Sequence, residues 1–508
     1  MMCRFSLGFV CWLSLIPTVP PLLAQDVVSS GLIPQQAARR YGMERAWFTQ
    51  LRVDPARGRV RDMRMYVSST RTQTVVQVRA ETGDKYRFTD RQLDMYGQPL
   101  GVDGAKKKAA EKQAALKVLG INSTVQEQVV PDVTLYLTSD DGMVQAVDAE
   151  TGKTIWARGV GNRDYPTLEP GVSEKYVVIV NGTTVYVLDA TSGAPVWQRN
   201  AAGVPAAGGT VIDEYVGVPM VTGELEVYSL APDASHWPTS YYSYGQVFSP
   251  PTRAGNRIVW ANSNGEITAA TPGQNAIQFR LSTGVPIRGQ ITYAAPDQLF
   301  AVTETGYLYS FKASTGEILW RFSTGDTTTL APIVVGNCVY VVTKYQGTFC
   351  VDAPTGRENW WARDVHQFVA ATDRRVYGVT TAGRIAVLDR RTGGVVGTIP
   401  TVLTDILFTN PQSDRIYVAS ASGLLQCVHA IGADWPLIHI AAEAAESSPP
   451  EKSASGAKPA PAPAVKPIDP FGGGAATPAP KPAPPKAGEK PAAKKPDASK
   501  PAADNPFG

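Results

Sequence analysis

The 508-residue chain has 48 lysine and arginine residues against 45 acidic residues, and a net charge of +3 gives it no strong electrostatic attraction to nucleic acid. Its hydrophobic content of 43% is that of a globular protein, and its length allows two to four domains or one large repeat array. We therefore expect a folded protein that has no nucleic-acid partner.

Residues 1–24 have the pattern of a secretory signal peptide. Arg4 precedes an apolar run from Phe5 to Leu23 that prolines interrupt, and Ala24 offers a small residue at the cleavage point. A membrane-spanning helix needs about 20 uninterrupted apolar residues. We expect cleavage near Gln25, no transmembrane span afterwards, and an extracytoplasmic protein, either periplasmic or secreted.

Residues 25–124 are predicted to form a small β-rich module. Two strand-like runs, 45–53 and 59–68, flank a Pro-Ala-Arg-Gly turn and suggest a hairpin. A second hairpin is expected from residues 72–79 and 85–89. Strong helix formers then predict a helix near residues 106–119, which Gly120 ends.

Residues 125–440 carry an internal repeat of about 40 residues. A glycine closes a β-rich run once in each unit, at Gly142, Gly182, Gly223, Gly265, Gly306, Gly347, Gly383 and Gly423. Strand-rich repeats of this period are typical of propeller blades. We predict an all-β propeller of about eight four-stranded blades, with seven as the alternative count.

Each unit also repeats a turn and an aromatic residue. An aspartate ends a strand and a glycine follows four residues later, so its carboxylate can accept backbone N–H bonds from the turn. The clearest of these aspartates are Asp148, Asp189, Asp352 and Asp389. The aromatic position, predicted to lie between adjacent sheets, falls on Trp156, Trp197, Trp237, Trp320, Trp360 and Trp435.

The motif Val/Leu-Asp-Ala-x-Thr-Gly-x-x-x-Trp resembles the pyrroloquinoline-quinone-like (PQQ-like) propeller repeat. The resemblance implies a β-propeller and raises the possibility of a quinone-dependent dehydrogenase. Those enzymes use adjacent cysteines beside the quinone, a calcium ion and a catalytic aspartate. Here Cys338 and Cys350 are 12 residues apart, no Cys-x-x-Cys-His haem motif is present, and the even repeat leaves no long insertion for an active-site lid.

The chain is therefore more similar to the non-catalytic branch of the family, which resembles the outer-membrane-protein assembly factor. This resemblance implies a protein-binding scaffold in the cell envelope, with protein partners and with no catalytic residue, cofactor or metal. The alternative is an enzyme like the PQQ-dependent dehydrogenases. Of the cysteines that follow the leader, Cys338 and Cys350 are either bridged or free thiols, and the spacing leaves both options open.

Residues 441–508 form a tail rich in proline, alanine and lysine that is predicted to be disordered. Two similar tetrapeptides occur in it, Asp469-Pro470-Phe471-Gly472 and Asn505-Pro506-Phe507-Gly508. Either Phe471 and Phe507 are anchors that dock into a partner, or the two motifs arise by chance in a biased composition.

Overall fold

The computed structural model describes residues 32–54, 58–231, 237–274, 276–399 and 406–439. The expected signal peptide, 1–24, and the expected tail, 441–508, with Phe471 and Phe507, lie outside the described residues. Within the described ranges, no helix is both long enough and apolar enough to cross a membrane.

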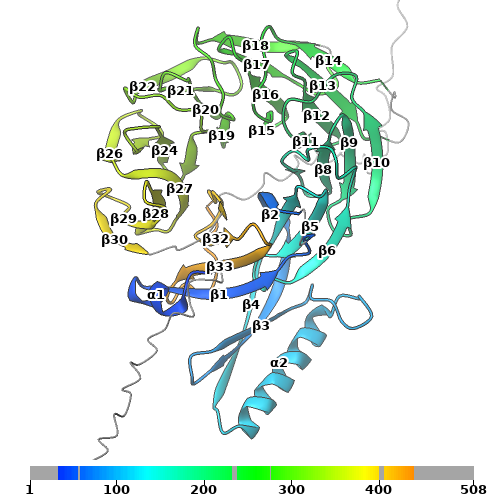
Figure 1. The fold of residues 1–508 in the computed structure, drawn as a ribbon, viewed down its shortest axis with the longest axis vertical. Helices are drawn as coiled ribbons and strands as arrows, with labels where there is room; N and C mark the ends of the chain where they lie inside the picture. Colours follow the sequence, from blue (N-terminus) through cyan, green and yellow to red (C-terminus); the bar gives the residue numbers. More distant parts are fainter. Residues whose placement is uncertain (1–31, 55–57, 232–236, 275, 400–405, 440–508) are drawn as a thin grey trace, which may run out of the picture. The chain divides into compact units, whose positions relative to one another are not determined.

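The described strands form eight antiparallel sheets arranged in a ring (Figure 1). Seven of these sheets have four strands, and the eighth has five. The predicted all-β propeller is therefore confirmed, with eight blades in the described part of the chain. We number the blades in chain order, beginning with the five-stranded sheet.

Blades 2 to 7 are each built from four consecutive strands. Blade 2 contains β7 (Gly171–Val172), β8 (Tyr176–Asn181), β9 (Thr184–Asp189) and β10 (Pro195–Asn200). Blade 3 contains β11 (Thr210–Ile212), β12 (Tyr215–Pro219), β13 (Glu224–Ser229) and β14 (Thr239–Tyr242). Blade 4 contains β15 (Thr252–Ala254), β16 (Arg257–Ala261), β17 (Glu266–Ala270) and β18 (Ile277–Ser282).

The next three blades repeat this order. Blade 5 contains β19 (Thr292–Ala294), β20 (Gln298–Val302), β21 (Tyr307–Lys312) and β22 (Ile318–Ser323). Blade 6 contains β23 (Ile333–Val335), β24 (Cys338–Val342), β25 (Thr348–Asp352) and β26 (Glu358–Ala362). Blade 7 contains β27 (Val365–Ala371), β28 (Arg375–Thr380), β29 (Ile385–Asp389) and β30 (Val395–Ile399).

The two inner strands of a blade are buried on both faces because neighbouring blades pack against them. In blade 2, for example, the β8 residues Val178 and Val180 pack with Val216 and Val218 of β12 in the next blade. This packing explains the nearly continuous Val, Ile and Tyr runs of the sequence, since a strand covered on both faces has no solvent side for polar residues.

Blade 8 is completed by the N-terminal part of the chain. It contains β31 (Ile406–Leu407), β32 (Ile416–Ala419) and β33 (Leu424–Ala430), and its fourth strand is β1 (Met43–Gln50). β1 pairs antiparallel with β33, from Met43 opposite Ala430 to Gln50 opposite Leu424. The pairing closes the ring, because it supplies the hydrogen-bond partners that the open edge of β33 requires.

Blade 1 also takes in a strand from the predicted N-terminal module. It contains β2 (Val60–Ala80), β4 (Ser123–Ser139), β5 (Met143–Asp148) and β6 (Thr154–Gly159), and residues Val60–Val67 pair with β4. The expected division between residues 124 and 125 is therefore wrong, and so is the hairpin expected from 45–53 and 59–68. The two runs are strands, but they lie in blades 8 and 1 and do not pair with each other.

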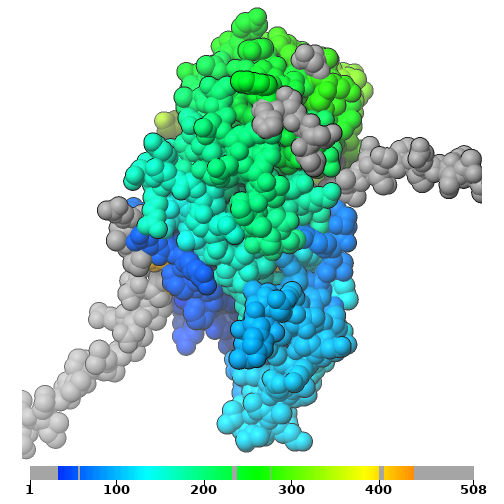
Figure 2. Space-filling model, turned by 90° about the vertical axis from the view of Figure 1, so that its right-hand side faces the viewer, coloured from blue at the N-terminus to red at the C-terminus, as the bar shows by residue number. Residues whose placement is uncertain are grey.

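A smaller module extends from blade 1, where β2 and β4 continue beyond the propeller as a long ribbon (Figures 1 and 2). β3 (Lys85–Thr89) pairs with the far half of β2, which gives the second expected hairpin. Helix α2 (Gly101–Val118) covers one face of this sheet, with Ala105, Ala109 and Leu116 packed on Val76 and Val78. The short helix α1 (Gln35–Arg40) precedes β1.

Candidate functional site

The repeat aspartates shape turns. The Asp148 carboxylate accepts the Thr151 backbone N–H at 2.8 Å and the Thr151 hydroxyl at 2.9 Å. Asp189, Asp352 and Asp389 accept from the equivalent turn residues, Ser192, Thr355 and Thr392. Burial raises the pKa of Asp148, whereas the backbone N–H of Thr392 lowers that of Asp389. Each of the four carboxylates thus accepts hydrogen bonds within its own turn.

Three of the predicted tryptophans each join the blade that carries them to the next blade. The indole N–H of Trp156 donates to the Ala190 carbonyl at 3.0 Å, that of Trp320 to Ala353 at 3.0 Å, and that of Trp360 to Arg390 at 2.8 Å. The ring also covers the turn glycine of the next blade. At Gly193, whose φ is +68°, a Cβ atom would come within 2.5 Å of the Trp156 ring. Trp197 is half-buried and meets Tyr228 edge to face.

Two of the predicted tryptophans lie elsewhere. Trp237 precedes β14 and is 83% exposed, whereas the buried aromatic residue on β14 itself is Tyr241, whose hydroxyl donates to the Thr271 carbonyl of blade 4. Trp435 follows β33 and lies beside Arg87 of β3. In blade 8 the joining residue is Trp47 of β1, which donates to the Ala149 carbonyl of blade 1 at 2.8 Å. Counting along the repeat missed Trp47 because the strand that carries it comes from the other end of the chain.

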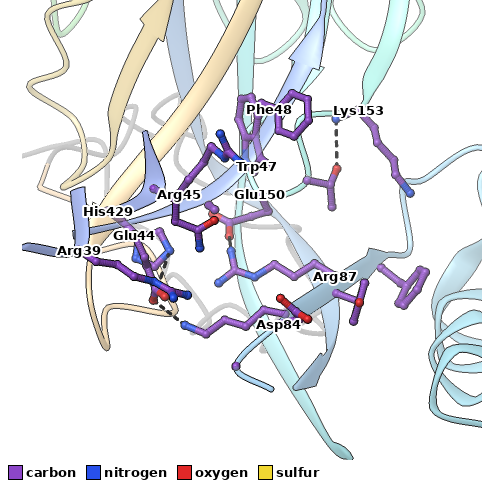
Figure 3. Close-up of a pocket in the computed structure, with 17 residues that line it drawn as sticks. Arg39, Glu44, Arg45, Trp47, Phe48, Asp84, Arg87, Glu150, Lys153 and His429 are labelled. Carbon is purple, nitrogen blue, oxygen red and sulfur yellow. Dashed lines mark hydrogen bonds and ion pairs between the residues drawn. The ribbon is translucent and has the colours of Figure 1, made fainter. Parts of the chain in front are cut away.

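A cleft of about 520 Å³ lies between blade 8 and the module (Figure 3). β1 and β3 line opposite sides of it, and each is the terminal strand of its own sheet. α1 and the turn after β5, which carries Glu150 and Lys153, complete its walls. No sequence pattern linked these segments, because only the closure of the ring and the long β2–β4 ribbon bring them together.

The inner part of the cleft is held by ion pairs. Lys85 of β3 contacts Glu44 of β1 at 2.6 Å and also pairs with Asp434. Arg87 pairs with Glu150 at 2.8 Å, and both side chains are largely buried. Burial, together with the positive charge of Arg415, lowers the pKa of His429 to about 3, so that this histidine is neutral. These contacts fix the module against blades 8 and 1.

Three further cations line the cleft without such a partner among the described residues. Arg39, Arg45 and Lys153 form no ion pair within the described ranges. The Arg45 guanidinium lies 4.8 Å from the centre of the Phe48 ring, and Phe48 is 55% exposed. Aromatic and arginine side chains are enriched at binding surfaces, so the cleft has the character of a binding site.

A second accessible feature is the outer edge of β4 in the module. Residues 124–129 are exposed, and β5 pairs with β4 only from Thr134 to Thr138, so no described strand pairs with this edge. The edge presents Val125 and Val129 on the side of α2, and it contains neither proline nor lysine. Natural proteins usually protect free edges with such residues or with charges. The charge of this edge is Glu127, which pairs with Lys106 of α2, so the backbone of the edge stays accessible to another strand.

Two observations bear on the quinone-dependent alternative. Within the described ranges, no group of three or more His, Cys, Asp or Glu side chains is arranged to hold a metal ion. Cys338 and Cys350 are free thiols on the neighbouring strands β24 and β25, and the Asn359 amide lies 4.0 and 3.8 Å from their sulfur atoms. The pair does not have the adjacent-cysteine arrangement of those enzymes.

The family model and the curated relatives that match this chain name the same family. The family model described as outer membrane protein assembly factor BamB matches residues 140–398. BamB of Moranella endobia is 24% identical over 258 residues, which is 46% of this chain and 66% of that protein. BamB of Shewanella oneidensis is 27% identical over 264 residues, 47% of this chain and 65% of that protein. The matched stretch thus covers slightly less than two thirds of these relatives.

Among solved structures, the crystal structure of BamB from Moraxella catarrhalis matches 58% of this chain and 91% of that chain. Its sequence is 18% identical and the TM-score is 0.48.

Proposed function

The chain belongs to the family of the outer membrane protein assembly factor BamB, and from that premise we propose that it is an extracytoplasmic, non-catalytic scaffold that binds protein partners during outer membrane protein assembly. The family name and the leader-like pattern of residues 1–24 support this location. The names of the curated relatives, which are assembly factors, favour a scaffold over a dehydrogenase.

The observation that carries the proposal is the free edge of β4 at residues 124–129. An extended polypeptide can pair with such an edge through its backbone, while alternate side chains decide which segments fit. On the α2 side the edge offers Val125 and Val129 on either side of Glu127, and on the opposite side it offers Gln126 and Gln128. A partner segment that alternates apolar and polar residues, as an unfolded β-strand of a barrel protein does, matches this edge.

The test is the binding of a urea-denatured, eight-stranded outer membrane β-barrel protein, diluted into buffer with the full chain and followed by fluorescence anisotropy. The double variant Val125→Lys and Val129→Lys places charges on the edge without touching a buried residue. We expect it to weaken binding at least tenfold, about 1.4 kcal/mol.

The matched control is Val395→Lys with Val396→Lys, which changes two exposed valines on β30, the terminal strand of blade 7. Its affinity should stay within about twofold of the parent. Equal losses in the two double variants, or no binding by the parent chain, would contradict the proposal.

A further inference from the structure

The cleft between blade 8 and the module carries more positive charge than its described residues pair. Five cationic residues line it, namely Arg39, Arg45, Lys85, Arg87 and Lys153. Lys85 and Arg87 pair with the acidic residues Glu44 and Glu150. The other three cations form no ion pair with a described residue. The cleft is therefore complementary to a negatively charged ligand.

The three cations that remain come from different elements of the chain. Arg39 lies in α1, Arg45 in β1, and Lys153 in the turn between β5 and β6. Figure 3 shows Arg39 and Lys153 on opposite sides of the cleft, with Arg45 between them. A compact anion cannot contact both Arg39 and Lys153, whereas an extended ligand with several carboxylates can.

The electrostatics of two of these cations favour an incoming anion. The pKa of Lys153 is lowered, first by partial burial and then by repulsion from Lys108 of α2, and Asp148 offsets this only in part. Burial also lowers the pKa of Arg45. An opposite charge within about 4–6 Å favours the charged form of such a group. A carboxylate in the cleft would therefore stabilise both cations.

The walls of the cleft have the shape expected for a polypeptide ligand. Five consecutive residues of β1, Glu44 to Phe48, and four consecutive residues of β3, Lys85 to Phe88, line the cleft. Because successive side chains of a strand point to opposite faces, a wall of consecutive residues means that the edge of the strand faces the cleft. Five strand residues span about 13 Å, so an extended segment of similar length can follow the cleft.

Side-chain charge, and not regular strand pairing, is expected to decide this contact. The register of β1 shifts between Arg45 and Trp47, and Ala46 has no partner on β33. Such a bulge interrupts the pairing pattern of an edge strand. Phe48, which is 55% exposed and lies under the Arg45 guanidinium, offers a ring against which an apolar side chain of the ligand can pack.

We propose that the cleft between β1 and β3 binds an extended, acidic segment of a partner protein, with carboxylates of the segment facing Arg39, Arg45 and Lys153. This second binding site is separate from the β4 edge. It does not rest on the proposed function, because it requires neither strand pairing nor an unfolded barrel protein.

The test measures the binding of a synthetic nine-residue peptide to the full chain by fluorescence anisotropy. Glutamate and serine alternate around a central benzoylphenylalanine, both ends are blocked, and the dye is neutral. We expect saturable binding that weakens as ionic strength rises, because salt screens partly exposed charges. The same peptide with glutamine in place of glutamate should bind at least tenfold more weakly. Equal binding of the two peptides, or no saturable binding, would overturn the proposal.

Neutral substitutions test the cations directly. Arg45→Gln combined with Lys153→Gln should weaken binding of the acidic peptide at least tenfold. The matched control is Arg321→Gln combined with Lys344→Gln, which removes the same charge from two cations that also lie over aromatic rings, in blades 5 and 6. Its affinity should stay within about twofold of the parent. Equal losses in the two double variants would show unspecific charge attraction and would overturn the proposal.

Irradiation of the bound peptide locates its site. Cross-links from benzoylphenylalanine to β1, β3 or the turn after β5 support the proposal, and cross-links confined to other elements overturn it. Free glutarate tests whether a compact anion is sufficient. We expect it to displace the peptide only at concentrations at least a hundredfold higher, and displacement at equal concentration would overturn the assignment to an extended segment.

The variant Val125→Lys with Val129→Lys keeps this site distinct from the β4 edge. It should leave the affinity for the acidic peptide within about twofold of the parent. A loss as large as that of the cleft variant would place the peptide on the edge and would overturn the proposal. Circular dichroism of each variant confirms that the folded state is retained.

Discussion

The regular blades and the module use their strands in different ways. Between blades 5 and 6, Trp320 reaches the Ala353 carbonyl and covers Gly356, so that one side chain joins two sheets. In the module, the buried amide groups of Gln73 and Gln77 retain polar atoms that have no hydrogen-bond partner within the described ranges. An unsatisfied buried group costs about 1–3 kcal/mol. Buried polar atoms without a partner among the described residues also occur in the blades, at Trp197 and Tyr340 for example, so the two regions do not differ in this respect. They differ in their strands, since the module leaves an edge of β4 that no described strand pairs with.

The largest expected effect separates a tryptophan inside the repeat from one outside it. Trp360→Ala removes a buried ring, its bond to Arg390 and its contact with Tyr340, so it should destabilise the fold by about 3–5 kcal/mol. Trp237→Ala, at an 83% exposed side chain, should cost under about 0.5 kcal/mol. Chemical denaturation measures both, and similar losses would contradict the assignment of Trp237 to the surface.

A smaller effect tests whether the N-terminal strand is a full member of a blade. Trp47→Phe keeps an aromatic ring but removes the bond to Ala149, and Trp156→Phe does the same to Ala190. Each should cost about 0.5–1.5 kcal/mol. If urea denaturation found that Trp47→Phe had no effect while Trp156→Phe did, the closure of the ring by β1 would contribute nothing to stability.

The pH dependence should differ between two aspartates that occupy the same repeat position. The folded-state pKa of Asp389 is below its ordinary value of 3.8, so its contribution to stability is present above that pH and is lost as pH falls through the lower value. The pKa of Asp148 is raised from 3.8, so stability is lost as pH rises from about 3.8 through the raised value.

Thermal midpoints of Asp389→Asn and Asp148→Asn, each measured against the parent from pH 3 to pH 7, check these signs. The deficit of Asp389→Asn should shrink as pH falls, whereas Asp148→Asn should become relatively more favourable as pH rises. Parallel curves for the two variants would contradict the opposite electrostatic environments of the two turns.

The last prediction is that the protein does not respond to the quinone. Addition of pyrroloquinoline quinone and calcium to the purified protein should produce neither saturable binding, followed by quinone absorbance, nor dye-coupled oxidation of alcohols or sugars. Saturable binding with turnover would instead favour the dehydrogenase alternative and would require a site outside the blades and cleft described above.

The sequence was most informative where structure depends on neighbouring residues. A blade is a run of hairpins, and its inner strands, turn aspartate and joining tryptophan fall within about 40 residues, so Asp189 and Trp360 could be placed by spacing alone. The spacing was misleading at Trp237 and Trp435, because the degenerate units contain an aromatic residue near the expected position that does not lie between sheets. A residue type at the right distance does not identify its partner.

By itself, then, the sequence determined the propeller class, the number of repeats and the turns, since each follows from a local pattern of side chains. Tertiary structure alone decided that β1 completes blade 8, that Trp47 joins blade 8 to blade 1, and that β1 and β3 form a cleft. The physical reason is that strands far apart in the chain pair through backbone N–H and C=O groups, which every residue type except proline carries in full. Backbone groups therefore leave no signature in the sequence that identifies the strand with which they will pair.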